Sequence, residues 1–116
     1  MGTIKMKLIY IAGPYRSSCQ LKTQRNIVRA ESVGKRVLTQ LTGWFPVIPH
    51  MNTAMWDFDP MLKTVSDKDY LDGTMEMMRR CDAVLAFDTS EGTRAEIAEA
   101  EKLGIPVYKR IEDVRN

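Results

Sequence analysis

Three polar segments contain the residue types that a small-molecule site needs. They are residues 13–18, 49–52 and 88–96, and each directly follows a short apolar run. Together they supply glycines, hydroxyls, an arginine, carboxylates and the only histidine of the chain. If the apolar runs are parallel strands, their carboxyl ends meet at one edge of a sheet, where open α/β sheets bind ligands. The pattern therefore predicts a polar site that includes Gly13 and His50.

Residues 90–96, Ser-Glu-Gly-Thr-Arg-Ala-Glu, form the most informative segment. A glycine-containing loop that opens a helix presents free N–H groups, and the helix dipole attracts anions there. Ser90, Gly92 and Thr93 are therefore predicted to bind a phosphate, with Arg16 as a charged partner. Glu96 is predicted in the first helical turn, where the dipole favours an ionised carboxylate. A fixed carboxylate beside an anion site suits cleavage of a glycosidic bond.

Each of these side chains also has a purely structural interpretation. Thr93 and Glu96 have the spacing of a capping box, in which the carboxylate bonds back to the start of its own helix. Such a carboxylate cannot also point into a cleft. His50 can be a hydrogen-bonded structural residue, Tyr10 can be core packing within an apolar strand, and Arg16 can be a solvated loop residue.

The predicted strands and helices alternate along the chain, and this alternation favours a parallel sheet with helices on both faces. Strands are expected at residues 8–12, 44–48, 83–87 and 105–108, helices at 23–41, 67–80 and 94–103, a loop at 49–60, and a short helical turn at 111–116. Gly43 and Gly104 are predicted to end helices, and Pro46 to mark an edge strand. We expect one domain, residues 1–116: a small flavodoxin-like or Rossmann-like three-layer α/β sandwich with about four strands.

The composition excludes several classes of protein. Among 116 residues, 17 Lys and Arg oppose 15 Asp and Glu, which gives a net charge of +2 with no basic run. This balance argues against binding to a nucleic acid polymer or a membrane surface. No apolar run is long enough to cross a bilayer or to act as a signal peptide. Cys19 and Cys81 lack metal-site spacing, so we expect free thiols in a reducing cytoplasm and no metal.

Several motifs together resemble the nucleoside 2-deoxyribosyltransferase-like superfamily, most closely its DUF4406 branch of small phage and bacterial proteins. The motifs are IYIAGPYR at 9–16, Pro49-His50, CDAVLAF at 81–87, Ser-x-Gly-x-x-x-Glu-x-x-x-Ala at 90–100 and GIPV at 104–107. The resemblance implies that Glu96 is a nucleophile attacking the anomeric carbon of a deoxyribose, with Tyr10 beside it. It implies that Ser90, Gly92 and Arg16 hold the 5′-phosphate and that His50 lies near the ligand. It also implies a homodimer or larger homo-oligomer and no cofactor.

The sequence departs from this family at a position that matters for catalysis. The glycosidases carry a helper aspartate about two turns before the residue that corresponds to Asp82, and Thr74 stands there instead. Loss of that group would remove the acid that assists departure of the base. Two functions therefore stay open. One is a nucleoside or 2′-deoxynucleoside 5′-monophosphate N-glycosidase or deoxyribosyltransferase, with the apolar loop 51–58 packed on the base. The other is a non-catalytic nucleotide-binding or sensing module.

Overall fold

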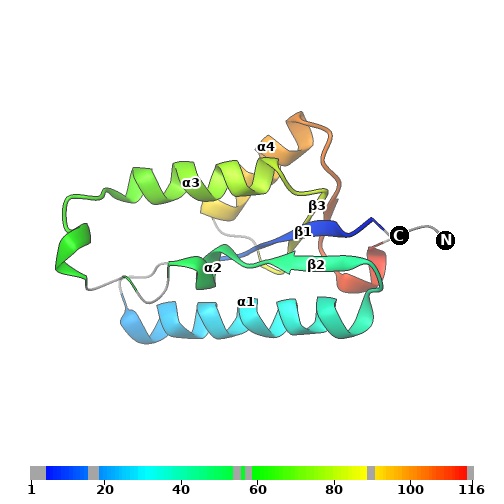
Figure 1. The fold of residues 1–116 in the computed structure, drawn as a ribbon, viewed down its shortest axis with the longest axis horizontal. Coiled ribbons are helices and arrows are strands. Elements are labelled where there is room, and N and C mark those ends of the chain that lie inside the picture. Colours follow the sequence, from blue (N-terminus) through cyan, green and yellow to red (C-terminus); the bar gives the residue numbers. More distant parts are fainter. Residues whose placement is uncertain (1–4, 16–18, 54–55, 57–58, 89–90, 115–116) are drawn as a thin grey trace.

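The protein is a three-layer sandwich in which helices cover both faces of one parallel sheet (Figure 1). The computed structural model describes residues 5–15, 19–53, 56, 59–88 and 91–114. In chain order the elements are β1 (Lys7–Ala12), α1 (Gln20–Gln40), β2 (Trp44–Val47), α2 (Pro49–Asn52), η2 (Pro60–Leu62), α3 (Asp67–Arg79), β3 (Ala83–Ala86), α4 (Glu91–Lys102), β4 (Val107–Tyr108) and η3 (Ile111–Asp113).

The sheet has four strands in the order β2-β1-β3-β4, and all three pairings are parallel. Tyr10 of β1 pairs with Val47 of β2 on one side and with Val84 of β3 on the other. Pro46 lies on the edge strand β2, as predicted, where the missing N–H leaves no central ladder bond unmade. The flavodoxin-like or Rossmann-like α/β class is confirmed. The strand order reverses between β1 and β3, so the ligand-binding crevice of such folds falls at their carboxyl ends.

Alternation along the central strands divides the core into two layers. Ile9 and Ile11 pack in one cluster with residues of α1, whereas Tyr10 and Ala12 pack in another with residues of α3 and α4. Figure 1 shows α1 on one face of the sheet and α3 on the other. The α1 layer is built from Ile9, Ile11, Ala30, Val37, Trp44, Ala83, Leu85, Ile111 and Val114. The other layer is built from Tyr10, Ala12, Met78, Cys81, Val84, Ala86 and Ala100. Tyr10 is therefore buried in the layer that also contains α4.

Glycines close two of the helix–strand connections, as the sequence predicts. Gly43 after α1 and Gly104 after α4 have positive φ values of 84° and 75°. Only glycine adopts this conformation without steric cost. At the second site the Gly104 N–H donates to the Glu101 carbonyl at 3.1 Å, and the Ile105 N–H donates to the Ala100 carbonyl at 2.8 Å. These bonds satisfy carbonyls at the end of α4 and turn the chain toward β4.

Several predicted bounds differ from the structure: α1 begins at Gln20, three residues earlier than predicted, and β4 at Val107, two residues later. Two further differences bear on the site. Residues 49–52, predicted as the start of a loop, form the short helix α2, which Pro49 begins because its fixed φ suits the first helical position. α4 begins at Glu91, three residues earlier than predicted. Thr93 therefore lies inside the helix and is not its N-cap. The capping-box interpretation of Thr93 and Glu96 is wrong for that reason.

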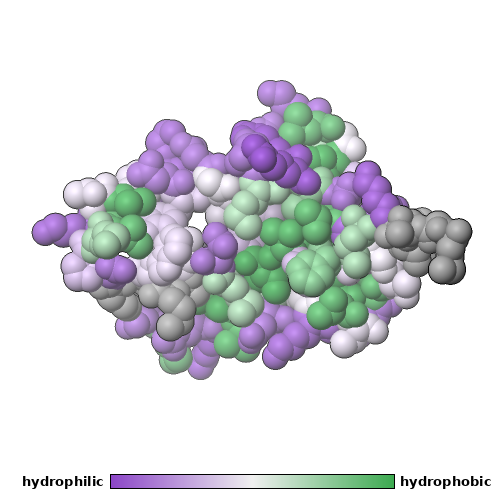
Figure 2. Space-filling view, in the orientation of Figure 1, coloured by the Kyte–Doolittle hydropathy of each residue, from purple (hydrophilic) through white to green (hydrophobic). Residues whose placement is uncertain are grey.

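The surface includes an apolar region at the β2 side of the sheet. Figure 2 shows hydrophobic side chains gathered over β2 and β1 on the face in view. Phe45 of β2 is 48% exposed and Leu38 of α1 is 58% exposed. Of the helices that the structure describes, none is both long enough and apolar enough to cross a membrane.

Candidate functional site

Glu96 lies on the stripe of α4 that faces the sheet. Thr93, Ile97 and Ala100 share this stripe, at the i, i+4 and i+7 spacing of one helix face. Thr93 is 2% exposed and Ala100 is fully buried, so Glu96 is a carboxyl group on an otherwise buried helix face. Among the described residues, no Lys, Arg or His pairs with it within 4 Å. A carboxylate without a cation is costly at such a position.

Glu96 and Tyr10 face each other from α4 and β1. The Tyr10 hydroxyl and the Glu96 Oε2 atom are both buried, and neither makes a hydrogen bond of full geometry in the described structure, although Tyr10 lies within reach of Glu96 and Thr74. The two groups nevertheless perturb each other. Burial raises the pKa of Glu96 to about 7, and the nearby Tyr10 hydroxyl opposes part of that rise. Burial, followed by the charge of Glu96, raises the pKa of Tyr10 far above its usual range, so the phenol stays protonated.

Burial works against the expected ionisation of Glu96. The prediction of an ionised carboxylate rested on a place in the first helical turn, next to the positive end of the dipole. The earlier start of α4 puts Glu96 in the second turn, where the dipole acts less. Burial dominates instead, and the group is about half protonated near pH 7.

Thr74 of α3 completes this cluster. Its hydroxyl interacts with the Tyr10 phenol and donates to the Leu71 carbonyl at 3.2 Å. The position that the family resemblance assigns to a helper aspartate therefore does face Tyr10, but it carries a hydroxyl without acidic character. Asp72, two residues earlier, points elsewhere, since it accepts a hydrogen bond from Lys68 at 2.6 Å. Sequence reasoning recognised Thr74 as a departure but did not place it in the site.

His50 holds the loop that follows β1. Its Nε2 atom lies 3.1 Å from the Gly13 carbonyl and 3.0 Å from the Pro14 carbonyl. Carbonyls only accept, so Nε2 carries the proton and Nδ1 is the acceptor. Burial lowers the pKa of His50, which is 3% exposed and therefore neutral. Nδ1 is buried without a partner, so any direct ligand contact of this ring must be made there.

The same loop is packed against neighbouring side chains. Asn26 of α1 donates to the Tyr15 carbonyl at 3.0 Å, and the Tyr15 ring meets the His50 ring edge-on at 5.5 Å. Gly13 is required by Phe87, because a Cβ on Gly13 would lie 2.1 Å from the Phe87 ring. Phe87 and Asn26 were not singled out from the sequence. The signal for Phe87 is that it ends the apolar run predicted as the strand 83–87, whereas nothing in the sequence marks Asn26.

The predicted site residues thus fall into four groups: two pairs that the structure brings together, two residues within α4, and two outside the described residues. The structure brings Glu96 and Tyr10 together, and it brings His50 and Gly13 together at the end of β1. Thr93 and Gly92 lie within α4, where Thr93 is buried. Arg16 and Ser90, the predicted phosphate-binding residues, lie outside the described residues. Within the described part of the chain, no three His, Cys, Asp or Glu side chains are arranged to hold a metal ion.

Fold and site together define an α/β protein in which a largely buried carboxyl group of α4 faces the central strand β1. The chain belongs to the family described as "Domain of unknown function (DUF7768)", which matches residues 7–110. A similar solved structure is that of a conserved protein from Enterococcus faecalis V583, with 26% identity and a TM-score of 0.59 over 88% of this chain. The chain spans 61% of that protein's length. No curated protein matches the chain.

Proposed function

We propose that the protein is an N-glycosidase or deoxyribosyltransferase that acts on a nucleoside or a 2′-deoxynucleoside 5′-monophosphate, with Glu96 as nucleophile. The observation that carries the proposal is the buried pair formed by the Tyr10 hydroxyl and Glu96 Oε2, which perturb each other but make no hydrogen bond of full geometry. Buried polar groups are nearly always hydrogen-bonded, and the exceptions concentrate at functional sites. A hydroxyl group of a sugar, which donates and accepts, would satisfy both atoms at once.

Each of the two residues has a role in the proposed chemistry. Ionised Glu96 attacks the anomeric carbon, which becomes cationic as the bond to the base breaks, and a covalent glycosyl ester forms. Water, or a second base, then takes the sugar and releases the carboxylate. Tyr10 remains protonated throughout, so it acts as a hydrogen-bond donor that orients the carboxylate. His50 keeps the Gly13–Pro14 backbone in place through Nε2 and is a positioning residue.

Thr74 limits which substrates can react. Its hydroxyl cannot supply the proton that helps a base to leave. The reaction therefore favours nucleosides whose base departs easily without enzymatic protonation. The same observation supports a second candidate function, a nucleotide-binding or sensing module that performs no chemistry. In that case Glu96 and Tyr10 would bind the sugar and nothing more.

The decisive experiment is a Glu96→Ala variant assayed for base release from a panel of nucleosides and deoxynucleoside 5′-monophosphates. We expect release by the wild-type protein and a loss of about a thousandfold or more in the variant, as for other nucleophile removals. Glu101→Gln is the matched control, because Glu101 is an exposed carboxylate on the same helix. Release at the wild-type rate by Glu96→Ala would exclude the nucleophile. Calorimetric binding of a nucleotide without turnover would favour the binding module.

The pH profile gives an independent reading of the same residue. A nucleophilic carboxylate must be ionised, so kcat/KM should fall as the pH drops through about 7, the pKa of Glu96. A carboxyl group with its ordinary pKa would hold activity down to a much lower pH. A profile that stays flat between pH 8 and pH 5 would therefore contradict the assignment of Glu96.

A further inference from the structure

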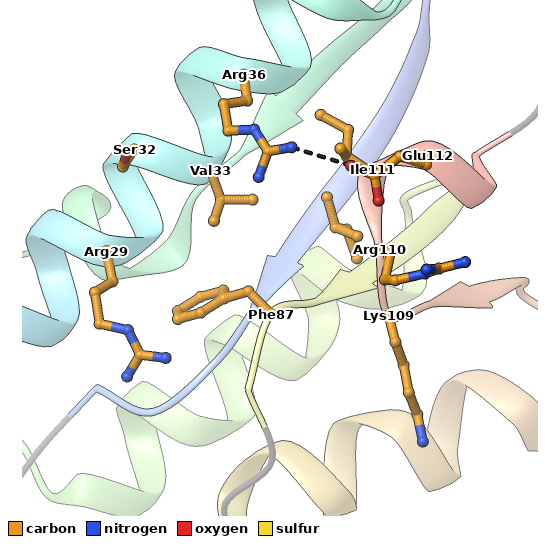
Figure 3. Close-up of a pocket in the computed structure, with 10 residues that line it drawn as sticks. Arg29, Ser32, Val33, Arg36, Phe87, Lys109, Arg110, Ile111 and Glu112 are labelled. Atoms are coloured by element: carbon orange, nitrogen blue, oxygen red, sulfur yellow. Dashed lines mark hydrogen bonds and ion pairs between the residues drawn. The ribbon is translucent and has the colours of Figure 1, made fainter.

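A polar cavity lies on the opposite face of the sheet from Glu96 and Tyr10. It has a volume of about 380 Å³ and lies between α1 and the segment that follows β4 (Figure 3). This volume is within the range of small-molecule sites. The apolar side chains that line it are Val33, Leu85, Phe87 and Ile111. The proposed function does not use this cavity, which we call the α1 pocket.

Positive charge is concentrated around the α1 pocket. Four of its ten lining residues are cationic and one, Glu112, is acidic. Arg29 and Arg36 are seven residues apart on α1, which places them on one helix face about 10 Å apart. Figure 3 shows them flanking the pocket, with residues 109–112 opposite. The net formal charge of the lining is +3, and Asp88 and Asp113, which pair with Arg29 and Arg110, reduce the local excess to +1.

The carboxylates that already contact these arginines are weak competitors for them. Arg29 pairs with Asp88 at 2.8 Å and Arg36 with Glu112 at 3.2 Å. All four side chains are between 40% and 62% exposed, so these ion pairs are solvated and contribute little. Lys109 makes no ion pair with any described residue. A ligand with two negative charges can therefore displace a carboxylate at modest cost.

Phe87 gives the pocket a flat apolar surface. The Arg29 guanidinium lies over its ring, 5.2 Å from the ring centroid, so cation and ring already form one recognition surface. Guanidinium groups bind phosphate in a bidentate manner, and an aromatic face accepts a planar ring. We propose that the α1 pocket binds an organic phosphate: a phosphate group on Arg36, and a planar ring against Val33 and the surface formed by Phe87 and Arg29.

The test is a titration of the isotope-labelled protein with phenyl phosphate and, separately, with inorganic phosphate. Neither probe has a glycosidic bond, so the result does not depend on the proposed function. We expect saturable shifts of the Val33, Phe87 and Ile111 signals, with tighter binding of phenyl phosphate. The Arg36→Gln variant should weaken binding about tenfold, the value of one charge-assisted hydrogen bond.

Lys35→Gln is the matched control for charge. Lys35 is the neighbouring cation on α1, its side chain is 74% exposed and it does not line the pocket. It should change binding by less than about twofold, because an exposed charge outside the site is largely screened. The proposal would be overturned if no signals shift on titration. It would also be overturned if Arg36→Gln and Lys35→Gln have equal effects, or if the two probes bind with equal affinity.

Discussion

At the scale of single residues, Glu96 is expected to oppose folding. Its pKa rises from 4.5 in the unfolded chain to about 7 in the folded protein, so the folded state prefers the protonated form. The stability that this preference provides is complete below pH 4.5 and is lost as the pH rises through 7. A rise of this size corresponds to at most about 3 kcal/mol, and partial exposure of the side chain reduces it.

We therefore predict that Glu96→Gln raises the free energy of unfolding by about 1–3 kcal/mol at pH 8. At pH 4.5 this gain in the free energy of unfolding should shrink to a few tenths of its value at pH 8, because the wild-type Glu96 carboxyl is then protonated in the folded state. Urea titrations at the two pH values measure both effects. Glu101→Gln on the exposed side of the helix should change neither value. A destabilised Glu96→Gln protein at pH 8 would mean that the carboxylate is stabilised by a contact other than those described.

The sequence was sufficient to find Glu96 but not to predict its ionisation. The Ser-x-Gly-x-x-x-Glu spacing identifies the residue, because a polar loop before a helix is a local feature. Its pKa depends first on burial of the side chain, and then on Tyr10, which is 86 residues away in the chain. Thr74 shows the same limit, since its contact with Tyr10 joins α3 to β1. Only the packing of three elements reveals the cluster.

At the scale of the elements, two glycines show how local backbone conformation decides stability. Gly104 has φ of 75° at the end of α4, whereas Gly73 lies on the exposed side of α3, where no φ penalty applies. No heavy atom outside its immediate chain neighbours lies within 4 Å of a Cβ added at either position, so packing is not the difference between them. Gly104 therefore tests the cost of a left-handed backbone for alanine, and Gly73 tests the gain from the higher helix propensity of alanine.

We predict opposite signs for the two alanine substitutions. Gly104→Ala should lower the free energy of unfolding by about 1 kcal/mol, because alanine is strained at positive φ. Gly73→Ala should raise it by about 0.5–1 kcal/mol, because alanine loses less backbone entropy in a helix. Thermal or urea unfolding of both variants measures the difference. The same sign for both would show that α4 does not end in the described way.

Strands and long helices were predictable because their patterns are local, whereas short elements and helix starts were not. The apolar runs fixed β1 and β3 to within a residue or two. The helix α2 was missed because it spans only Pro49–Asn52, too few residues for a periodic pattern. The start of α4 was misplaced because Thr93 satisfies the spacing of a capping box equally well. Thr93 packs against the sheet, and this packing places it inside the helix instead of at its N-cap. The sequence does not show that packing.

At the scale of the whole molecule, the α/β class followed from the alternation of strands and helices, and Pro46 indicated the edge strand. The α1 pocket could not be predicted, because Arg29, Arg36 and residues 109–112 are far apart in the chain. The expected homo-oligomer stays a prediction. Gly13 and Phe87 link the loop after β1, which His50 holds, to the α1 pocket on the other face of the sheet. Phe87 contacts Gly13 of the loop after β1, lies 5.9 Å from the His50 ring and also lines the α1 pocket.

This junction predicts strong coupling between positions 13 and 87. The Cβ of a Gly13→Ala variant would lie 2.1 Å from Phe87 Cζ, so the ring must move. We expect a loss of about 1–3 kcal/mol in unfolding free energy, the usual cost of overpacking. Phe87→Leu removes the obstructing ring, so the double variant should be more stable than the sum of the two losses by about 1 kcal/mol or more. Gly73→Ala combined with Phe87→Leu should be additive, because Gly73 has nothing near its added Cβ. Additive losses at positions 13 and 87 would show that the loop after β1 shifts independently of the ring, and the two faces would then not be joined there.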